Sequence, residues 1–162
     1  MKGRLRVLRL GADDLVTIMR KVLFVCTGNT CRSPMAKCVF DKAAKECGLD
    51  ATAECAGMHT QDGLPYAANS VEAMAELGIK LVGTSKQITP ELLEECDLVF
   101  GLTYQLNTSL VASFPKYSEK IYRFPLDVPD PFGGDLGMYK RSLSRITEGI
   151  KRIIAAMQSG KL

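Results

Sequence analysis

The sequence predicts a three-layer α/β fold, in which a four-stranded parallel sheet carries helices on both of its faces. Short β-rich runs alternate with helical stretches from about residue 20 onward, and this alternation is typical of parallel sheets built from βαβ units. Residues 21–26 (KVLFVC) form a compact, unbroken hydrophobic run, as expected of a strand covered on both faces. We therefore place this run as the first strand of the parallel sheet.

The other elements are expected to follow in order. A helix is expected over residues 33–47, because Pro34 suits an early helical position and Gly48 suits the residue after a helix. Further strands are expected over residues 51–56, 97–102 and 120–124, and further helices over residues 67–77, 90–96, 105–114 and 138–158. The expected apolar face of the helix over residues 67–77 consists of Val71, Met74, Ala75 and Leu77.

Length and charge limit the class of protein. The chain of 162 residues fits one domain with a proper hydrophobic core. Its net charge of +3 is too small to indicate nucleic acid or an anionic membrane as the main partner, and no apolar run approaches the roughly 20 residues that span a bilayer. We expect residues 19–162 to form a single domain. Residues 1–18 are expected to be a disordered N-terminal extension or a misassigned start, with an edge strand over residues 5–10 as the alternative.

The cysteines are expected to be reduced. Six are present, at positions 26, 31, 38, 47, 55 and 96. Charged residues interrupt residues 1–20, so no signal-peptide core is present, and free thiols in a cytoplasmic protein are the better interpretation. The chain has no Cys-x-x-Cys pair, and His59 is its only histidine, which argues against a structural zinc site.

The segment after the first strand indicates a phosphate-binding loop. It begins with Cys26, and its other residues are Thr27, Gly28, Asn29, Thr30, Cys31, Arg32 and Ser33. A loop of this length between a strand and a helix can turn its backbone N–H groups inward and bind a tetrahedral oxyanion, and the helix N-terminus adds a favourable field. We call residues 26–33 the phosphate loop.

These residue types also support nucleophilic chemistry. The inward N–H groups favour the thiolate of Cys26, which attacks phosphorus to form a phospho-cysteine. Arg32 is suited to bind two oxygens of the phosphoryl group. Ser33 is expected to donate a hydrogen bond to the sulfur, and Asn29 to hold the shape of the loop. The plain alternative is a buried cysteine beside a surface arginine.

The motif VCTGNTCRSPMA closely resembles the active-site loop of low-molecular-weight protein tyrosine phosphatases. The resemblance covers essentially residues 19–160. It implies a four-stranded parallel sheet flanked by helices and a cysteine-dependent protein phosphatase without a metal or organic cofactor. Its expected partners are phosphorylated proteins, and its expected product is inorganic phosphate.

A phosphatase of this kind needs a general acid for the leaving group and then a general base for water. Three aspartates in the loop over residues 125–137 are candidates: Asp127, Asp130 and Asp135. The residues alone leave the choice among them open. The family's acid stands in an Asp-Pro pair before an aromatic residue, so the resemblance assigns the role to Asp130 and places Phe132 at the wall of the substrate cleft.

Thr30 bears on the substrate. Tyrosine-directed members of the family usually carry a bulky aliphatic residue there, and Thr30 together with Phe132 resembles the protein arginine phosphatase branch. The Thr30 hydroxyl can also bond to a phosphoguanidinium group, to which Asp130 can bind as well. We therefore predict phosphoarginine on proteins as the substrate, with phosphotyrosine as the alternative. The plain interpretation is that Thr30 only satisfies backbone groups of the loop.

Cys31 is predicted as a redox partner for Cys26. The two cysteines are five residues apart in a loop that must curl, so a reversible disulfide can protect the nucleophile from over-oxidation. Simple packing beneath the loop is the alternative for Cys31, and it is the interpretation for the other four cysteines.

Two other functions remain as alternatives. An arsenate reductase of this fold would also use Cys26, but it needs a further redox pair of cysteines, and only Cys96 lies in the later half of the chain. A non-catalytic phosphate-binding module would need neither a nucleophile nor an acid. The chain also departs from the family pattern at Cys55-Ala56-Gly57 and at Lys86, which affects the rim of the cleft rather than the proposed chemistry.

Overall fold

The computed structural model describes the backbone of residues 4–10 and 13–162, and the side chains of residues 19–162. Four parallel strands lie in the order β3-β2-β4-β5 and form the sheet of the domain. Their bounds are β2 Asp13–Cys26, β3 Ala51–Gly57, β4 Leu98–Gly101 and β5 Ile121–Arg123. The predicted four-stranded parallel sheet is therefore confirmed.

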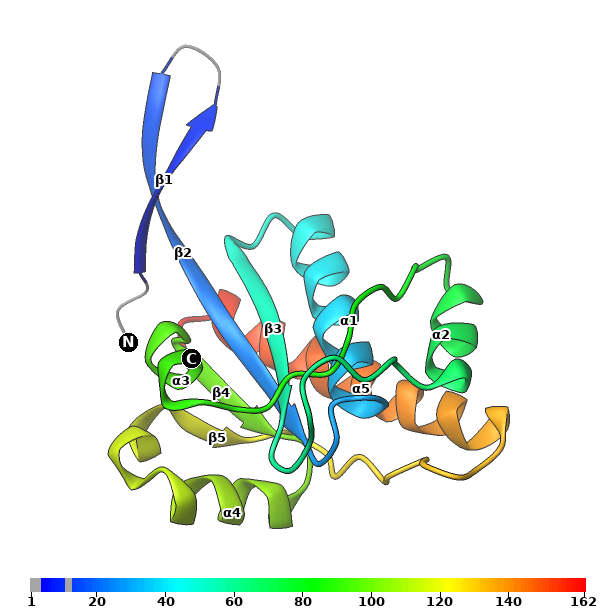
Figure 1. Cartoon of the computed structure of the whole chain (residues 1–162). Coiled ribbons are helices and arrows are strands. Elements are labelled where there is room, and N and C mark those ends of the chain that lie inside the picture. Colours follow the sequence, from blue (N-terminus) through cyan, green and yellow to red (C-terminus); the bar gives the residue numbers. More distant parts are fainter. Residues whose placement is uncertain (1–3, 11–12) are drawn as a thin grey trace.

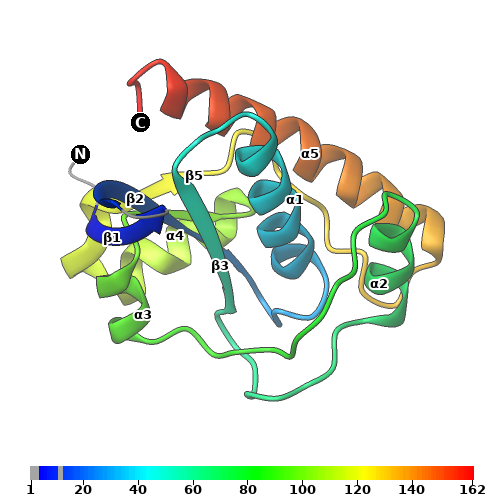
Figure 2. The ribbon, with the colours of Figure 1, turned by 90° about the horizontal axis from the view of Figure 1, so that it is seen from above.

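Helices cover both faces of this sheet (Figures 1 and 2). On one face lie α1 (Arg32–Glu46) and α5 (Leu136–Gln158), with α2 (Ala68–Ala75) packed against α5. On the other face lie α3 (Pro90–Glu95) and α4 (Tyr104–Ser113), and the 3-10 turn η1 (Pro115–Lys120) leads into β5. The three-layer arrangement is as predicted.

The N-terminal part of the chain forms a hairpin. Strand β1 (Arg4–Leu10) pairs antiparallel with the first part of β2, from Leu10 opposite Asp13 to Arg4 opposite Met19. The edge strand considered as an alternative falls on β1, while residues 1–3 and 11–12 of the expected extension lie outside the described residues. The division into an extension and a single domain over residues 19–162 stays a prediction.

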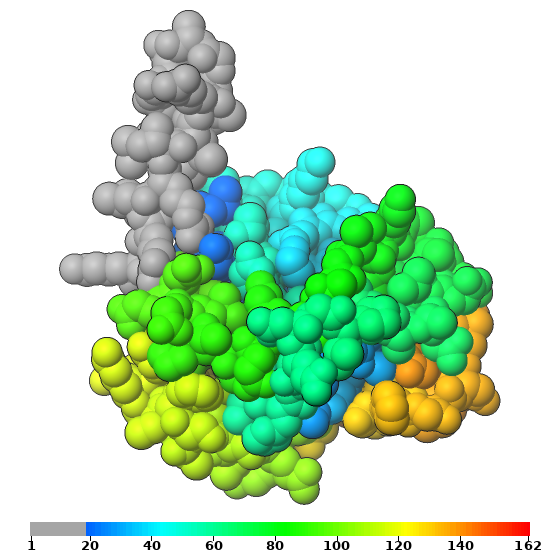
Figure 3. All heavy atoms as spheres, viewed as in Figure 1, coloured from blue at the N-terminus to red at the C-terminus, as the bar shows by residue number. Residues whose placement is uncertain are grey.

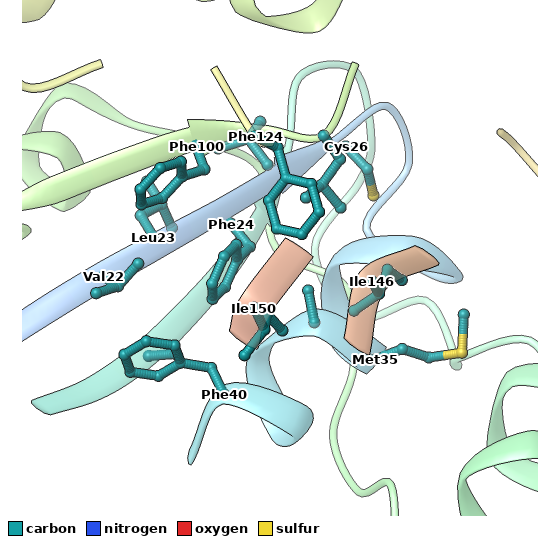
Figure 4. Close-up of a cluster of buried hydrophobic side chains, with 14 of the residues drawn as sticks. Val22, Leu23, Phe24, Cys26, Met35, Phe40, Phe100, Phe124, Ile146 and Ile150 are labelled. Carbon is teal, nitrogen blue, oxygen red and sulfur yellow. The ribbon is translucent and has the colours of Figure 1, made fainter. Parts of the chain in front are cut away.

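The core centres on β2, which explains why its sequence is so hydrophobic. Four successive residues of β2, from Val22 to Val25, have no exposed surface. The ring of Phe24 stacks on Phe100 with ring centroids 5.9 Å apart, and Phe40 and Phe124 pack against it (Figure 4). Burying each such side chain stabilises the fold by about 1.5–3 kcal/mol. This cluster fixes the strand that ends at Cys26.

Two expectations about packing are wrong. On α2 the buried residues are Ser70, Ala73 and Met74, whereas Val71 and Ala75 of the helix, and Leu77 beyond its end, are exposed. The reason is that α2 turns the side with Ser70, Ala73 and Met74 toward the rest of the domain, where it contacts α5 and α1. Cys47 is also exposed, because it lies at the end of α1, beyond the part of the helix that is buried.

Within the described part of the chain, no helix is long and apolar enough to cross a membrane. The same residues contain no group of three or more His, Cys, Asp or Glu side chains that is suited to hold a metal ion.

Candidate active site

The phosphate loop leaves the sheet at its topological switch point. Strand β3 lies on one side of β2 and β4 on the other, so the connections from β2 and β4 diverge at their carboxyl ends. Ligands of open α/β sheets bind in this position. A cavity of about 910 Å³ opens there, and Figure 3 shows the blue atoms of the loop between the teal-green segment around residue 60 and the orange segment around residue 135. We call this cavity the cleft.

Seven of the eight residues of the phosphate loop line the cleft together with Asp130 and Phe132. The exception is Ser33, which is fully buried beneath the loop. The cleft also contains residues that the sequence did not indicate, namely Met58, His59, Thr60, Gln61, Leu64 and Gln87.

Cys26 ends β2 with its sulfur at the base of the loop, beyond the aromatic cluster (Figure 4). Its Sγ accepts a hydrogen bond from the Asn29 backbone N–H at 3.3 Å and lies 2.9 Å from Ser33 Oγ. Ser33 Oγ accepts from Asn29 Nδ2 at 2.7 Å, so its own proton is free to go to the sulfur or to Ala56 O, which is farther away at 3.4 Å. Donors to sulfur stabilise a thiolate.

Asn29 holds the loop in a conformation that few residues adopt. Its φ is +54°, in the left-handed region, where asparagine is tolerated better than most residues. Both ends of its side-chain amide are used: Nδ2 donates to Ser33, and Oδ1 accepts from the Lys86 backbone N–H at 2.8 Å. The side chain is fully buried, so the curl of the loop is fixed before any ligand arrives.

Arg32 begins α1 and reaches across to the loop over residues 125–135, which we call the acid loop. Nη1 donates to Val128 O at 3.1 Å, and Nη2 lies 3.7 Å from Asp130 Oδ2. Arg32 Nε is buried and has no hydrogen-bond partner among the described residues. No side chain caps the N-terminus of α1. A free guanidinium N–H and uncapped backbone N–H groups are what a phosphate needs.

The three candidate aspartates now separate by position. Asp127 accepts from the Tyr104 backbone N–H and pairs with Arg123, and Asp135 caps α5 by accepting from Met138 N. Only Asp130 lines the cleft. Its Oδ1 accepts from Phe132 N at 3.1 Å, its side chain is 53% exposed, and Phe132 is 75% exposed.

Thr30 and Cys31 occupy the middle of the loop. Thr30 Oγ1 lies 3.7 Å from Cys31 Sγ, and Cys31 Sγ lies 3.5 Å from the Tyr139 hydroxyl of α5. Burial, and then the contact with Cys31, raise the pKa of Tyr139, so this hydroxyl stays protonated and can donate to the sulfur. All six cysteines are free thiols.

The first residues of the loop are held by the chain after β3. His59 N donates to Thr27 O at 3.0 Å. A Cβ on Gly57 would lie only 2.7 Å from the same oxygen, so any larger residue there would push the two segments apart. A Cβ on Gly28, in contrast, would lie 3.7 Å from Thr30 Oγ1, which is an ordinary van der Waals contact.

Gln87 fastens one wall of the cleft, which no local sequence signal indicated. Its Nε2 donates to Met58 O and its Oε1 accepts from Thr60 N, both at 2.8 Å. We call residues 58–61 the cleft wall. Because the bonded partners of Gln87 lie more than 25 residues away in the chain, only the folded structure shows this contact.

Known proteins are similar to this chain in sequence. A sequence model described as low molecular weight phosphotyrosine protein phosphatase matches residues 21–161. A protein-arginine-phosphatase of Bacillus subtilis (strain 168) is 33% identical over 147 residues, covering 86% of this chain and 98% of that protein.

Solved structures agree in fold. A YwlE mutant from Bacillus subtilis superimposes with a TM-score of 0.83 at 32% identity, covering 86% of this chain and 99% of that one. A low molecular weight protein tyrosine phosphatase from T. tengcongensis gives a TM-score of 0.80 at 37% identity, covering 84% and 98%. Because the family model matches residues 21–161 of this chain and the relatives cover 84–86% of its length, the chain belongs to the low molecular weight phosphotyrosine protein phosphatase family.

Proposed function

We propose that this cysteine-based phosphatase hydrolyses phosphoarginine on proteins and releases inorganic phosphate. The observation that carries the choice of substrate is Thr30, a small hydroxyl residue that lines the cleft within the phosphate loop. The Bacillus subtilis relative named protein-arginine-phosphatase supports it. The tyrosine phosphatase from T. tengcongensis, at 37% identity, supports the alternative substrate, phosphotyrosine.

In the first step the Cys26 thiolate attacks phosphorus in line, and the bond between phosphorus and the arginine nitrogen breaks. The loop N–H groups and Arg32 hold the phosphoryl oxygens, with Arg32 Nε available for one of them. The acid form of Asp130 donates its proton to the departing guanidine nitrogen. The products are free arginine side chain and phospho-cysteine.

In the second step a water molecule attacks the phosphorus of the phospho-cysteine. Asp130, now a carboxylate, takes the proton from this water, and the bond between sulfur and phosphorus breaks. Ser33, 2.9 Å from the sulfur, donates a hydrogen bond to the departing thiolate. Inorganic phosphate then leaves, and Cys26 is ready for another cycle.

Paired peptides test the choice of substrate. We expect wild type to have a higher kcat/KM for a phosphoarginine peptide than for the matching phosphotyrosine peptide, and Thr30→Ile to reverse the order. Thr30→Val is the matched control, because it keeps the size of the residue and removes only the hydroxyl. Equal rates on both peptides in all three proteins would contradict the proposal.

The two other functions have less support. Cys96, the cysteine that an arsenate reductase would have to use, is fully buried just before the amino end of β4, whereas Cys26 lies at the carboxyl end of the neighbouring parallel strand β2. Burial raises the pKa of its thiol to about 12, so it is a poor nucleophile. A binding module has no use for Asp130 in the cleft. Loss of turnover in Cys26→Ser separates the enzyme from the module.

We also propose a reversible disulfide between Cys26 and Cys31 in the cytoplasm, where free thiols are normal. Peroxide oxidises Cys26 to a sulfenic acid and is reduced to water, and the Cys31 thiol then displaces a second water to form the disulfide. We expect activity after mild peroxide to return with dithiothreitol in wild type and to return far less in Cys31→Ser. Equal recovery in the two proteins would contradict the disulfide.

A further inference from the structure

A second cavity of about 410 Å³ adjoins the cleft. Five residues line both spaces: Thr27, Arg32, Met58, His59 and Asp130. The remaining walls of the second cavity are Thr103 and three residues of α4, namely Gln105, Leu106 and Ser109. Asp130, the proposed acid for the leaving group, is one of the residues that the two spaces share. We call the second cavity the α4 cavity.

This position gives the α4 cavity a relation to the substrate. A phosphorylated side chain points its phosphoryl group at Cys26, so its polypeptide backbone crosses the mouth of the site near Asp130. The chain on one side of the phosphorylated residue can lie against Leu64 and Phe132 of the cleft. The chain on the other side can then pass His59, which lines both spaces, toward the α4 cavity.

The lining of the α4 cavity is suited to peptide groups. Gln105 and Ser109 are exposed, and their side chains have no hydrogen-bond partner within the described part of the chain. They are four residues apart on α4 and so share one face of it. An amide and a hydroxyl can each donate and accept, as a peptide group requires. The buried side chain of Leu106 forms an apolar floor between them.

The first turn of α4 is also held in place. Thr103 Oγ1 accepts from Leu106 N at 3.1 Å, and Asp127 Oδ1 accepts from Tyr104 N at 3.0 Å. The backbone of the helix also packs closely against Gly101, the last residue of β4, because a Cβ on Gly101 would lie only 2.7 Å from Asn107 N. A binding surface that is fixed in advance loses little entropy when a ligand is bound.

We propose that the α4 cavity is a subsite for the polypeptide chain on one side of the phosphorylated residue, bound through its peptide groups by Gln105 and Ser109. The proposal rests on the proposed function in one respect, that the substrate is a phosphorylated protein. Because the two side chains are uncharged, the subsite accepts varied sequences and favours an extended chain over a free phosphorylated amino acid.

The test compares substrates of increasing length. We measure kcat/KM for free phosphoarginine, for a peptide extended only on the amino side, and for a peptide extended only on the carboxyl side. We expect one of the two peptides to exceed the free amino acid, and the double substitution Gln105→Ala with Ser109→Ala to lower the ratio of that peptide to the free amino acid about five- to tenfold. Ser113→Ala, on the same helix but outside the cavity, keeps the wild-type ratio.

Three results would overturn the subsite: no advantage of either peptide over the free amino acid, an unchanged ratio in the double variant, or an equal loss on all three substrates. The proposed function fails separately. If wild type hydrolyses phosphotyrosine but not phosphoarginine, the substrate is wrong, and the same ratio measured with phosphotyrosine and its two extended peptides decides the subsite. A wild type that hydrolyses neither overturns both.

Discussion

The phosphate loop and the acid loop face each other across the cleft, but they are built in different ways. In the phosphate loop, Asn29 and Ser33 are fully buried, and Arg32 is only 4% exposed. In the acid loop, Asp130 is half exposed, and Phe132 is the most exposed large hydrophobic residue on the described surface. The bond from Ser142 Oγ to Pro129 O, at 2.8 Å, is the tether next to Asp130.

The difference follows from what each loop has to do. The phosphate loop must present donors to a charge of fixed shape, and donors that are already oriented cost no reorganisation during the reaction. In the proposed function the acid loop meets leaving groups on protein surfaces of many shapes, which agrees with the exposure of Asp130 and Phe132. A substrate therefore covers the exposed side chains of the acid loop, whereas its phosphoryl group binds to a phosphate loop whose shape is already fixed.

The largest expected effect comes from the centre of the phosphate loop. Cys26→Ser should lower kcat by about 10⁴-fold or more, because the serine hydroxyl lacks a general base to activate it. Phosphate release from a phosphopeptide measures the loss, and Cys38→Ser on α1, outside the cleft, serves as the control. A Cys26→Ser protein that retains more than about a hundredth of wild-type activity would show that another nucleophile acts.

The second effect tests the acid loop. Asp130→Asn should lower kcat by about 10²- to 10⁴-fold, because proton transfer to the leaving group is lost. Its free energy of unfolding should change by less than about 0.5 kcal/mol, as for other exposed residues. Asp127→Asn is the matched control, because it weakens a cap of α4 and leaves the proposed acid in place. Compared with Asp130→Asn, it should lower the free energy of unfolding more and kcat less. The opposite pattern in these two variants would move the acid to Asp127.

The third effect tests how far the shape of the phosphate loop is fixed in advance. Asn29→Ala removes two side-chain hydrogen bonds and leaves a left-handed backbone, so kcat/KM should fall about 10- to 100-fold and stability by about 2–4 kcal/mol. Asn29→Gly removes the backbone strain but does not restore the lost bonds, so its stability, measured by urea denaturation, should lie between those of Asn29→Ala and wild type. An Asn29→Gly protein with full activity would mean that the side chain is dispensable.

The smallest effect concerns the cleft wall. Gln87→Leu removes both bonds to residues 58–61, so we expect KM for phosphopeptides to rise about three- to tenfold, from one or two lost hydrogen bonds, with kcat within about twofold. Gln87→Glu keeps the acceptor for Thr60 N and should fall between wild type and the leucine variant. If KM stays at its wild-type value in both variants, the wall does not depend on Gln87.

Much of this molecule follows from local sequence. The last helix was expected to begin at Met138 and begins at Leu136, because Asp135 is an N-cap that the Pro- and Gly-rich loop concealed. The strand over residues 21–26 continues back to Asp13, since its hairpin partner rather than its own hydrophobicity supports the earlier part. Short helices such as α2 were the least predictable, because contacts with α5 and α1 decide which side of α2 is buried.

The chemistry was easier to predict than its supports. Cys26, Arg32 and Ser33 are close in sequence, so a strand-to-helix junction is enough to bring them together. Lys86 and Gln87 act on Asn29 and the cleft wall only through contacts between distant parts of the chain. The family resemblance pointed to Asp130, but only the structure shows that Asp127 and Asp135 accept hydrogen bonds at helix N-termini.

The Arg32 guanidinium has two roles, and both must be considered when its variants are interpreted. The guanidinium that we propose binds the phosphoryl group also donates a hydrogen bond to Val128 O of the acid loop, so truncating Arg32 removes both a charge and this bond. Free guanidinium ions added to an Arg32→Ala protein would restore the positive charge but not the covalent link from α1 to the hydrogen bond with Val128 O. The fraction of turnover that such chemical rescue fails to restore would measure how much the hydrogen bond from Arg32 to Val128 O contributes to activity.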